Sequence, residues 1–282
     1  MKKFIIFIAF CFGISFSMAA AFHFAGLEYG SLWGQLLGSI YMLVPVLSVI
    51  LTQLLTKEKP LSGVGLSFKL NKWWIVGWLA MPVFNVLAMF ASTLLPEVSF
   101  SIDNELIRNS LETAAKAGTP MGPWGFFWIT ILSSLLAGAT INAFFALGEE
   151  IAWRGYLPRI FKDWSFLKKC LVIGVVWGLW HAPLILMGHN YPSHPVIGVF
   201  MMVLFCVLFT PVLLFLREKG KSVILPAIAH GTLNASAGLS IAYLTSYNDL
   251  LGGSCGLVGM AILLLTDVAI FLYLSKKEAC SR

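Results

Sequence analysis

The chain has 282 residues, of which 59% are hydrophobic and only 11% are charged, and its mean hydropathy is +0.86. Soluble domains carry about 25% charged residues, so this composition excludes a water-soluble globular fold and predicts an all-α, polytopic membrane protein. The net charge of +6 does not indicate nucleic-acid binding, because the basic residues cluster in alternate connections between apolar runs. Five scattered cysteines, none in a Cys-x-x-Cys spacing, argue against a disulfide framework and a cysteine metal site.

Eight apolar runs are long enough to cross a bilayer, at about 20 residues each. They cover residues 4–27, 33–55, 73–95, 124–153, 169–187, 196–216, 222–245 and 255–274. An even number of spans with basic flanks at both termini predicts that both ends are cytoplasmic. We therefore expect a single membrane domain over residues 1–282 with about eight transmembrane helices.

Three segments outside the central spans carry their own signals. Lys2 and Lys3 followed by an apolar stretch are typical of a signal peptide, but the apolar run continues through Leu27, which favours an uncleaved anchor. In the longest connection, 96–123, Asp103 can cap a short helix that lies at the membrane interface. His189 and His194 fall in an HNYPSH loop, where we expect solvated side chains.

Few ionisable residues fall within the spans, and such residues are functional candidates because charge is costly in a bilayer. Three spans carry a cluster of polar groups, in the segments GEEIAWRGYLPRI (Glu149, Glu150, Arg154), WGLWHAP (Trp177, His181) and PAIAHGTLN (His230, Asn234). Counted inward from the nearest basic flank at about 1.5 Å per residue, Glu149, His181 and His230 lie at depths of about 15, 18 and 14 Å. The sequence therefore predicts that the three clusters meet at one level. Asp267 stands alone in the last span and is interpreted as a polar contact between helices.

Spacing within each helix separates the roles of these groups. Glu150 and Arg154 are four residues apart, which is the spacing of an intrahelical ion pair. Glu149 lies about 100° round the helix and has no such partner, which suits a general base. His230 and Asn234 share a helix face in the same way.

Small residues recur every four positions in two of these spans. The stripes are Gly174, Gly178 and Ala182 in the fifth span, and Ala227, Gly231 and Ala235 in the seventh. Such stripes let membrane helices approach closely. They predict that the fifth and seventh spans pack near each other, with their histidines adjacent.

Glu-Glu-x-x-x-Arg, an aromatic residue four positions before a histidine, and His-x-x-x-Asn, in this order on separate helices, resemble the motifs of the CPBP (Abi) family of intramembrane proteases. This family includes the type II CAAX prenyl endopeptidases. The resemblance covers a catalytic core over residues 124–250, and Trp177 stands where the family usually has phenylalanine. It implies an eight-helix bundle around an intramembrane cavity that opens to the cytoplasm and laterally to lipid, in a prokaryotic inner membrane.

The same resemblance implies roles for individual residues. Glu149 would activate the attacking water with His181 as its partner, His230 and Asn234 would stabilise the oxyanion, and Glu150, Arg154 and Trp177 would support them. The function implied is hydrolysis of a peptide bond in a membrane-associated or lipidated, CAAX-like peptide. The expected partners are membrane lipid and this peptide or lipidated protein, without nucleic acid.

Metal dependence and two other functions stay open at this point. Glu149, His181 and His230 could supply a three-ligand zinc site, but the HExxH pairing is absent, so we favour glutamate chemistry with no cofactor required over Zn²⁺ or another divalent metal. A non-catalytic bacteriocin-immunity or scaffold protein is the main alternative. A proton-coupled transporter using Glu149, Glu150 and Asp267 is less favoured, because no motif recurs in the first four spans.

Overall fold

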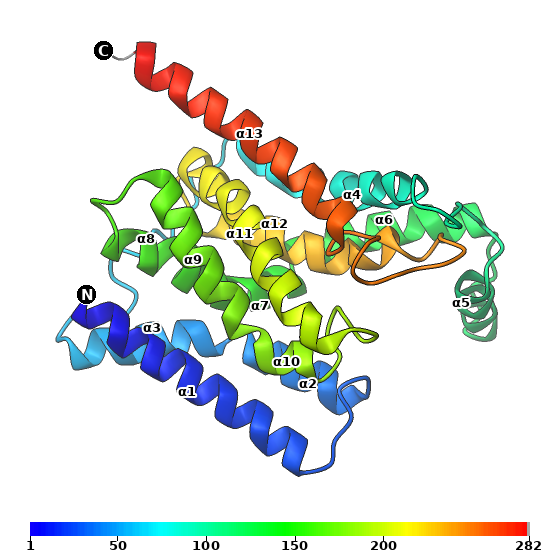
Figure 1. The fold of residues 1–282 in the computed structure, drawn as a ribbon, viewed down its shortest axis with the longest axis horizontal. Coiled ribbons are helices and arrows are strands. Elements are labelled where there is room, and N and C mark those ends of the chain that lie inside the picture. Colours follow the sequence, from blue (N-terminus) through cyan, green and yellow to red (C-terminus); the bar gives the residue numbers. More distant parts are fainter. Residues whose placement is uncertain (281–282) are drawn as a thin grey trace.

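The computed structural model describes residues 1–280, with side chains described as far as Lys277. Over these residues the protein is helical, and its β structure is confined to one bridge between Phe100 and Leu244. The helices are α1 (Lys2–Phe24), α2 (Leu32–Tyr41), α3 (Val44–Leu55), α4 (Lys72–Ser92), α5 (Glu105–Lys116), α6 (Pro123–Ala139), α7 (Ile141–Glu150), the π-helical turn η1 (Ile151–Tyr156), α8 (Leu157–Ile160), α9 (Phe166–Trp180), α10 (Ala182–Leu186), α11 (Pro195–Gly220), α12 (Ile224–Ser236), the 3-10 turn η2 (Ala237–Ser240) and α13 (Leu257–Cys280) (Figure 1). The predicted all-α class is confirmed.

Every apolar run is helical, but eight complete spans are not confirmed. Within the described residues, five helical segments are long and apolar enough to cross a membrane, namely α1, α2 with α3, α4, α11 and α13. A sixth consists of α6 and the helix from Ile141 to Ile160, which are bent by 48° at their junction. The remaining two, α9 with 15 residues and α12 with 13, extend only about 22 and 20 Å, which is short of a hydrocarbon core of about 30 Å.

Local backbone features explain these interruptions. Thr140, between α6 and α7, has the non-helical angles φ −121° and ψ −97°. Pro183 lies in the first turn of α10, where its missing N–H is tolerated although it cannot continue the hydrogen-bond ladder of α9. Of the three polar clusters, the one with His181 lies directly at a break, between α9 and α10.

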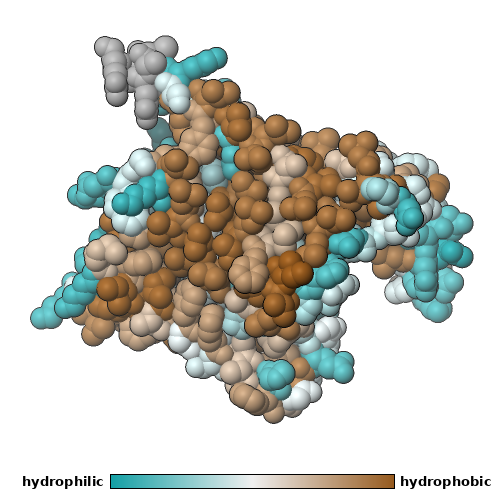
Figure 2. Space-filling model, in the orientation of Figure 1, coloured by the Kyte–Doolittle hydropathy of each residue, from teal (hydrophilic) through white to brown (hydrophobic). Residues whose placement is uncertain are grey.

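The surface matches a membrane location. Apolar side chains cover the middle of the face seen in Figure 2, and hydrophilic side chains gather toward its two ends. The start of α1 and the last turns of α13 lie at one end of the bundle, which we call the terminal end (Figure 1). The opposite, distal end is formed by the loops 25–31, 187–194 and 241–256 (Figure 1).

The helices of the motifs pack differently from the prediction. A Cβ at Gly174 would lie 2.5 Å from the Cα of Val207, so α9 presses its small residues against α11. A Cβ at Gly231 would lie 2.5 Å from the backbone nitrogen of Ala143, so α12 uses its stripe against α7. The prediction that the two stripes join the fifth and seventh spans is wrong, because each stripe contacts a different neighbour.

The interfacial helix is present with a different cap. Asn104, not Asp103, is the N-cap of α5, and its side chain accepts a hydrogen bond from the backbone N–H of Ile107 at 2.9 Å. Asp103 instead lies 3.3 Å from Arg108 as an exposed ion pair. Ile107 is buried and attaches α5 to the bundle.

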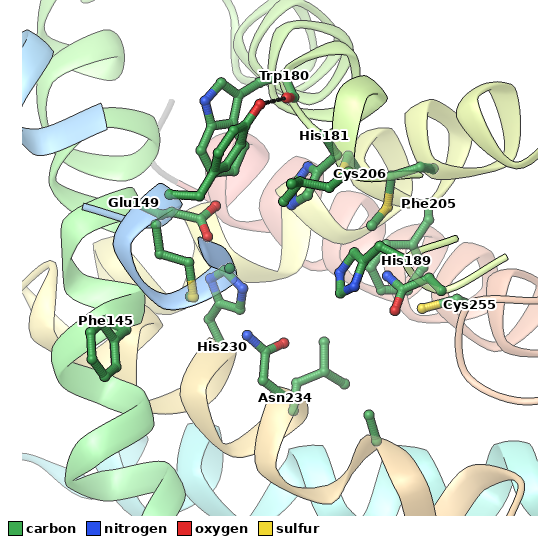
Figure 3. A pocket seen from close by; sticks show the side chains of 18 of the residues that line it. Phe145, Glu149, Trp180, His181, His189, Phe205, Cys206, His230, Asn234 and Cys255 are labelled. Atoms are coloured by element: carbon green, nitrogen blue, oxygen red, sulfur yellow. Dashed lines mark hydrogen bonds between the residues drawn. The ribbon is translucent and has the colours of Figure 1, made fainter. Parts of the chain in front are cut away.

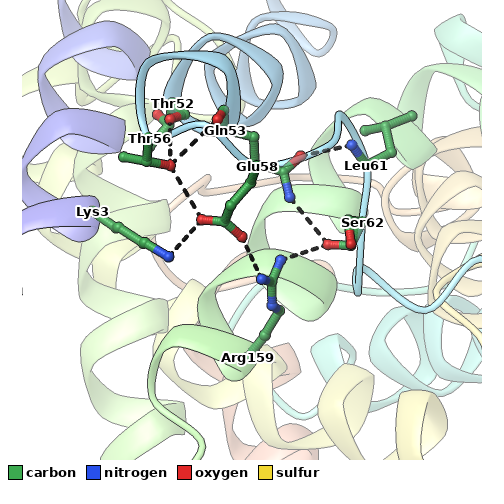
Figure 4. Close-up of polar contacts among 8 residues, drawn as sticks. All are labelled: Lys3, Thr52, Gln53, Thr56, Glu58, Leu61, Ser62 and Arg159. Carbon is green, nitrogen blue, oxygen red and sulfur yellow. Dashed lines mark hydrogen bonds and ion pairs between the residues drawn. The ribbon is translucent and has the colours of Figure 1, made fainter.

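A polar cluster ties α1 to the rest of the terminal end (Figure 4). The Glu58 carboxylate lies 2.6 Å from the ammonium of Lys3 and also pairs with the guanidinium of Arg159. Arg159 donates a further hydrogen bond to the carbonyl of Ser62 at 2.5 Å. The hydrogen bond from Lys3, followed by those from Arg159, holds the pKa of Glu58 below its usual range.

Candidate active site

The three polar clusters of the sequence line one cavity of about 430 Å³. Figure 3 shows Glu149 on one side of it, His181 across from it, and His230 with Asn234 below. Trp177 also contributes to the wall. Helices α7, α9 and α12 thus bring together residues that are up to 85 positions apart in the sequence.

Glu149 is held through one of its two carboxylate oxygens. It lies in the last turn of α7 and is 1% exposed. Its Oε2 accepts hydrogen bonds from the indole N–H of Trp177 at 2.6 Å and of Trp153 at 3.2 Å. Among the described residues no donor reaches Oε1, so one oxygen is anchored and the other is available for chemistry.

Trp177 also orients the neighbouring histidine. The Nδ1 atom of His181 lies 2.9 Å from the backbone carbonyl of Trp177, one helical turn earlier. Because a carbonyl can only accept, Nδ1 carries the proton and Nε2 is left as an acceptor. A single residue of α9 therefore contacts both Glu149 and His181.

Glu150 and Arg154 form the ion pair that their spacing predicted, and both are fully buried. Arg154 donates to Glu150 Oε1 at 3.0 Å, and its guanidinium lies 4.0 Å from the centre of the Trp177 ring. The same Glu150 oxygen lies 2.9 Å from Nδ1 of His230. Glu150 thus orients a histidine on another helix as well as pairing with Arg154.

A change of helix type accompanies these contacts. Trp153 and Arg154 both lie in the π-helical turn η1, which begins directly after Glu150. Turns of this kind are frequent at functional sites, where they redirect side chains. Here the turn supplies one hydrogen-bond partner to each of the two adjacent glutamates, Glu149 and Glu150.

Asn234 completes the cavity wall. It lies one turn after His230 on α12, and its side chain is exposed to the cavity. No described residue forms a hydrogen bond with its amide. An amide N–H donor and an imidazole therefore stand next to each other, below the glutamate in Figure 3.

The three candidate metal ligands do not form a metal site. Glu149, His181 and His230 line the same cavity, yet within residues 1–280 no three His, Cys, Asp or Glu side chains are grouped closely enough to hold a metal ion. The Oε2 atom of Glu149 faces two indole donors, and Nδ1 of His230 faces Glu150. As they are arranged here, these residues do not fit a bound metal.

Asp267 lies away from this site. It is on α13, 5% exposed, and does not line the cavity. Its Oδ1 is buried without a hydrogen-bond partner among the described residues. The expected polar contact between helices is therefore not made by this oxygen.

Sequence reasoning missed Trp153, which contacts Glu149 from behind the cavity wall, and His189, which lines the cavity. Trp153 had a readable signal, since it follows Glu149 by four residues just as Arg154 follows Glu150. His189 was expected in a solvated loop, but it lines the cavity, and its Nδ1 lies 3.1 Å from the hydroxyl of Tyr29. This pairing joins two loops and has no local sequence signal.

The cavity extends toward the distal end of the bundle. Its far wall is formed by Tyr29, His189, Asn190 and Cys255, which belong to the three distal loops. The described lining residues include none from the connections at the terminal end. The implied opening on the side of the termini does not match this cavity.

Comparison with known proteins agrees with the motifs. A family model described as type II CAAX prenyl endopeptidase Rce1-like matches residues 123–236. Over 65 residues the chain is 34% identical to CAAX prenyl protease 2 of Methanococcus maripaludis, and this alignment covers 23% of the chain and 21% of that protein. The chain thus matches about a fifth of the length of that curated relative. The family match runs from α6 to the end of α12 and includes all seven residues of the motifs.

Proposed function

We propose that this chain, whose residues 123–236 belong to the Rce1-like family of CAAX prenyl endopeptidases, is an intramembrane endopeptidase. Its substrate is a membrane-associated or lipidated peptide. The observation that carries the proposal is the anchored carboxylate of Glu149, which shares a cavity with His181, His230 and Asn234. The basic flanks support a single membrane domain with both termini in the cytoplasm, and the membrane we propose is a prokaryotic inner membrane.

The reaction we infer uses water and no covalent enzyme intermediate. Glu149 takes a proton from a water molecule through its free oxygen while the water oxygen attacks the carbonyl carbon of the peptide bond. His181 accepts a hydrogen bond from the same water at Nε2, because its Nδ1–H is bound to the carbonyl of Trp177. The attack produces a tetrahedral oxyanion and a protonated Glu149.

The second half of the reaction restores the enzyme. The amide of Asn234 donates a hydrogen bond to the oxyanion, and His230, whose Nδ1–H is bound to Glu150, donates another from Nε2 in its doubly protonated form. When the carbon–nitrogen bond breaks, the proton on Glu149 passes to the leaving amine. The buried pair of Glu150 and Arg154 contributes by holding His230 and the Trp177 ring in place.

Cleavage of quenched fluorescent peptides, farnesylated and plain, by the purified protein in detergent tests this proposal. Replacing a general base lowers the rate by about 10²–10⁴-fold, so we expect a loss of that size in Glu149→Gln. Removing one oxyanion donor lowers it by about 10²–10³-fold, which is the expectation for Asn234→Ala. Asp267→Asn is the matched control, because it removes a buried carboxylate outside the cavity and should leave the rate unchanged.

Two results would contradict the proposal. If folded wild-type protein cleaves no peptide, the non-catalytic immunity or scaffold role is favoured. If a chelator abolishes cleavage and Zn²⁺ restores it, the metal-free mechanism is wrong even though the protease assignment stands.

A further inference from the structure

The terminal end of the bundle carries a group of lysines and aromatic rings that the catalytic cavity does not use. Lys219 lies in the last turn of α11, and its ammonium is 4.2 Å from the centre of the Tyr273 ring of α13 and 5.5 Å from the indole of Trp73 of α4. It also donates a hydrogen bond to the Tyr273 hydroxyl at 2.7 Å. A single lysine thus contacts three helices, two of which end here (Figure 1).

Two further lysines converge on the same place. Lys72 is the first residue of α4, and Lys277 lies on α13 one turn after Tyr273. The charges of both act on the Tyr273 hydroxyl. The side chain of Asn71 donates a hydrogen bond to the backbone carbonyl of Lys219 at 3.1 Å, which holds the start of α4 against the end of α11. We call this group the lysine–aromatic cluster, and its members are Lys72, Trp73, Lys219, Tyr273 and Lys277.

The positive charges of the lysine–aromatic cluster have no counter-charge among the residues whose side chains are described. No carboxylate of that part of the chain lies within ion-pair distance of the three lysines, and this includes Glu218, the neighbour of Lys219 in the sequence. An ammonium has three N–H donors, and the hydrogen bond to Tyr273 uses only one of those on Lys219. Three like charges held together repel one another, so a bound anion stabilises this arrangement.

The aromatic members indicate the depth of the cluster in the membrane. Tryptophan and tyrosine are enriched where hydrocarbon meets water, and Trp73 and Tyr273 lie on either side of the Lys219 ammonium. Deeper along α4 and α13, exposed side chains are apolar, as at Val76, Leu79 and Val268. A molecule seated on the cluster therefore meets positive charge at its head and an apolar surface beneath it. A free phosphate ion would use only the first of these features.

We propose that the lysine–aromatic cluster binds the phosphodiester headgroup of an anionic phospholipid, whose acyl chains lie along the exposed apolar faces of α4 and α13. The lipid joins three helices and lies outside the cavity of Glu149, whose lining includes none of the five residues of the cluster. It belongs to the leaflet at the terminal end, for which we propose a cytoplasmic location. Binding needs no proteolytic activity, so this proposal and the proposed function can fail independently.

The expected selectivity follows from the number of lysines. Each lysine near an anionic membrane surface contributes about a fivefold gain in affinity, so three lysines favour an anionic over a zwitterionic headgroup by about 100-fold. The full chain is titrated in a neutral detergent with phosphatidylglycerol or with phosphatidylcholine of the same acyl chains. Native mass spectrometry then counts the bound lipids. We expect the first phosphatidylglycerol to bind with about 100-fold higher affinity than the first phosphatidylcholine.

Substitutions in the cluster separate charge from packing. Lys219→Met keeps an apolar stem against the rings and removes the charge, so the affinity for phosphatidylglycerol should fall about fivefold, whereas Lys219→Arg should retain it. Lys277→Gln, at an exposed position of α13, makes the same test without touching the rings and should also cause a fall of about fivefold. Lys168→Gln is the matched control, because Lys168 also lies over an indole at the terminal end, 4.3 Å from the centre of the Trp164 ring, and it should leave the affinity unchanged. Thermal unfolding without lipid checks that each variant is folded.

Three results would overturn the proposal. The first is equal binding of phosphatidylglycerol and phosphatidylcholine by wild type. The second is a loss in Lys168→Gln as large as the loss in Lys277→Gln, which would mean that the general surface charge attracts the lipid. The third is displacement of the first bound phosphatidylglycerol by inorganic phosphate, which would make the cluster a site for the free ion.

Discussion

Trp177 is the residue whose substitution tests the arrangement of the site most sharply. Its indole N–H donates the shorter of the two hydrogen bonds to Glu149, at 2.6 Å compared with 3.2 Å from Trp153. Trp177→Phe removes this donor and keeps an aromatic ring beneath the Arg154 guanidinium, which lies 4.0 Å from the ring centre. Because an aromatic side chain stays in place, the substitution should be tolerated.

The expected loss follows from the type of hydrogen bond. A hydrogen bond to a charged group contributes about 1.5–3 kcal/mol, which corresponds to a fall in kcat of about 10- to 150-fold if the whole bond serves to position the carboxylate. We expect KM to change little, because the anchored oxygen is not the one that faces the substrate. Trp153→Phe removes the longer bond and should have a smaller effect.

The assay is peptide cleavage in detergent, combined with thermal unfolding of each variant. Trp78→Phe is the matched control, because its indole donates to the backbone carbonyl of Leu135 at 2.9 Å, between α4 and α6. It should lower stability by about 0.5–1.5 kcal/mol without changing kcat. Wild-type kcat in Trp177→Phe would refute the positioning role, and an equal loss in Trp78→Phe would show that general stability is being measured.

Three further predictions concern stability. Arg154→Met leaves the carboxylate of Glu150 buried without its cation and should lower the free energy of unfolding by about 3–5 kcal/mol. This loss should appear as a large fall in the melting temperature, and a small fall would mean that solvent reaches this pair. Gly174→Ala places a methyl group 2.5 Å from the backbone of α11 and should lower the free energy of unfolding by about 1–3 kcal/mol. Gly13→Ala is its control, because nothing lies within 4 Å of the added methyl group, and it should be neutral or stabilise the protein by up to about 1 kcal/mol. Equal effects of the two substitutions would contradict the close packing of α9 on α11. The pKa of Glu58 is lowered by its cationic partners. Its contribution to stability is therefore complete above the ordinary glutamate pKa and is lost as the pH falls through the lowered pKa. Glu58→Gln should make the fall in melting temperature at acid pH less steep, and an unchanged slope would mean that other groups cause this fall.

The helical segments could be predicted because hydropathy acts locally along the chain. The number of complete spans could not be predicted, because a long apolar run in the sequence does not show where a helix within it ends. Pro183 marks the break after α9 in the sequence, because a proline has no N–H to continue the hydrogen bonds of that helix. Thr140 breaks α6 from α7 without a proline at the junction, and Gly138 two residues earlier is the one local signal.

Contacts within one helix of the site could be predicted from the sequence, whereas contacts between helices could not. The pair of Glu150 and Arg154 was predictable because helix geometry alone brings residues four apart together. The hydrogen bonds from Trp177 to Glu149 and from His230 to Glu150 join residues 28 and 80 positions apart, and these depend on how the helices pack. The small-residue stripes correctly indicated close packing, but a stripe carries no information about which helix it meets.

The contacts of α1 impose an order on how the protein is made. This helix is synthesised before α9, yet its Ser15 receives the indole N–H of Trp180, which is 165 residues later in the chain, and its Phe7 packs on Trp153. At a translation rate of about 5–20 residues per second, α1 waits about 8–33 s before the partner of this serine has been synthesised. During that interval the nascent chain has no functional cavity, so the catalytic centre can assemble only after the α9 segment has been inserted beside a helix already in place.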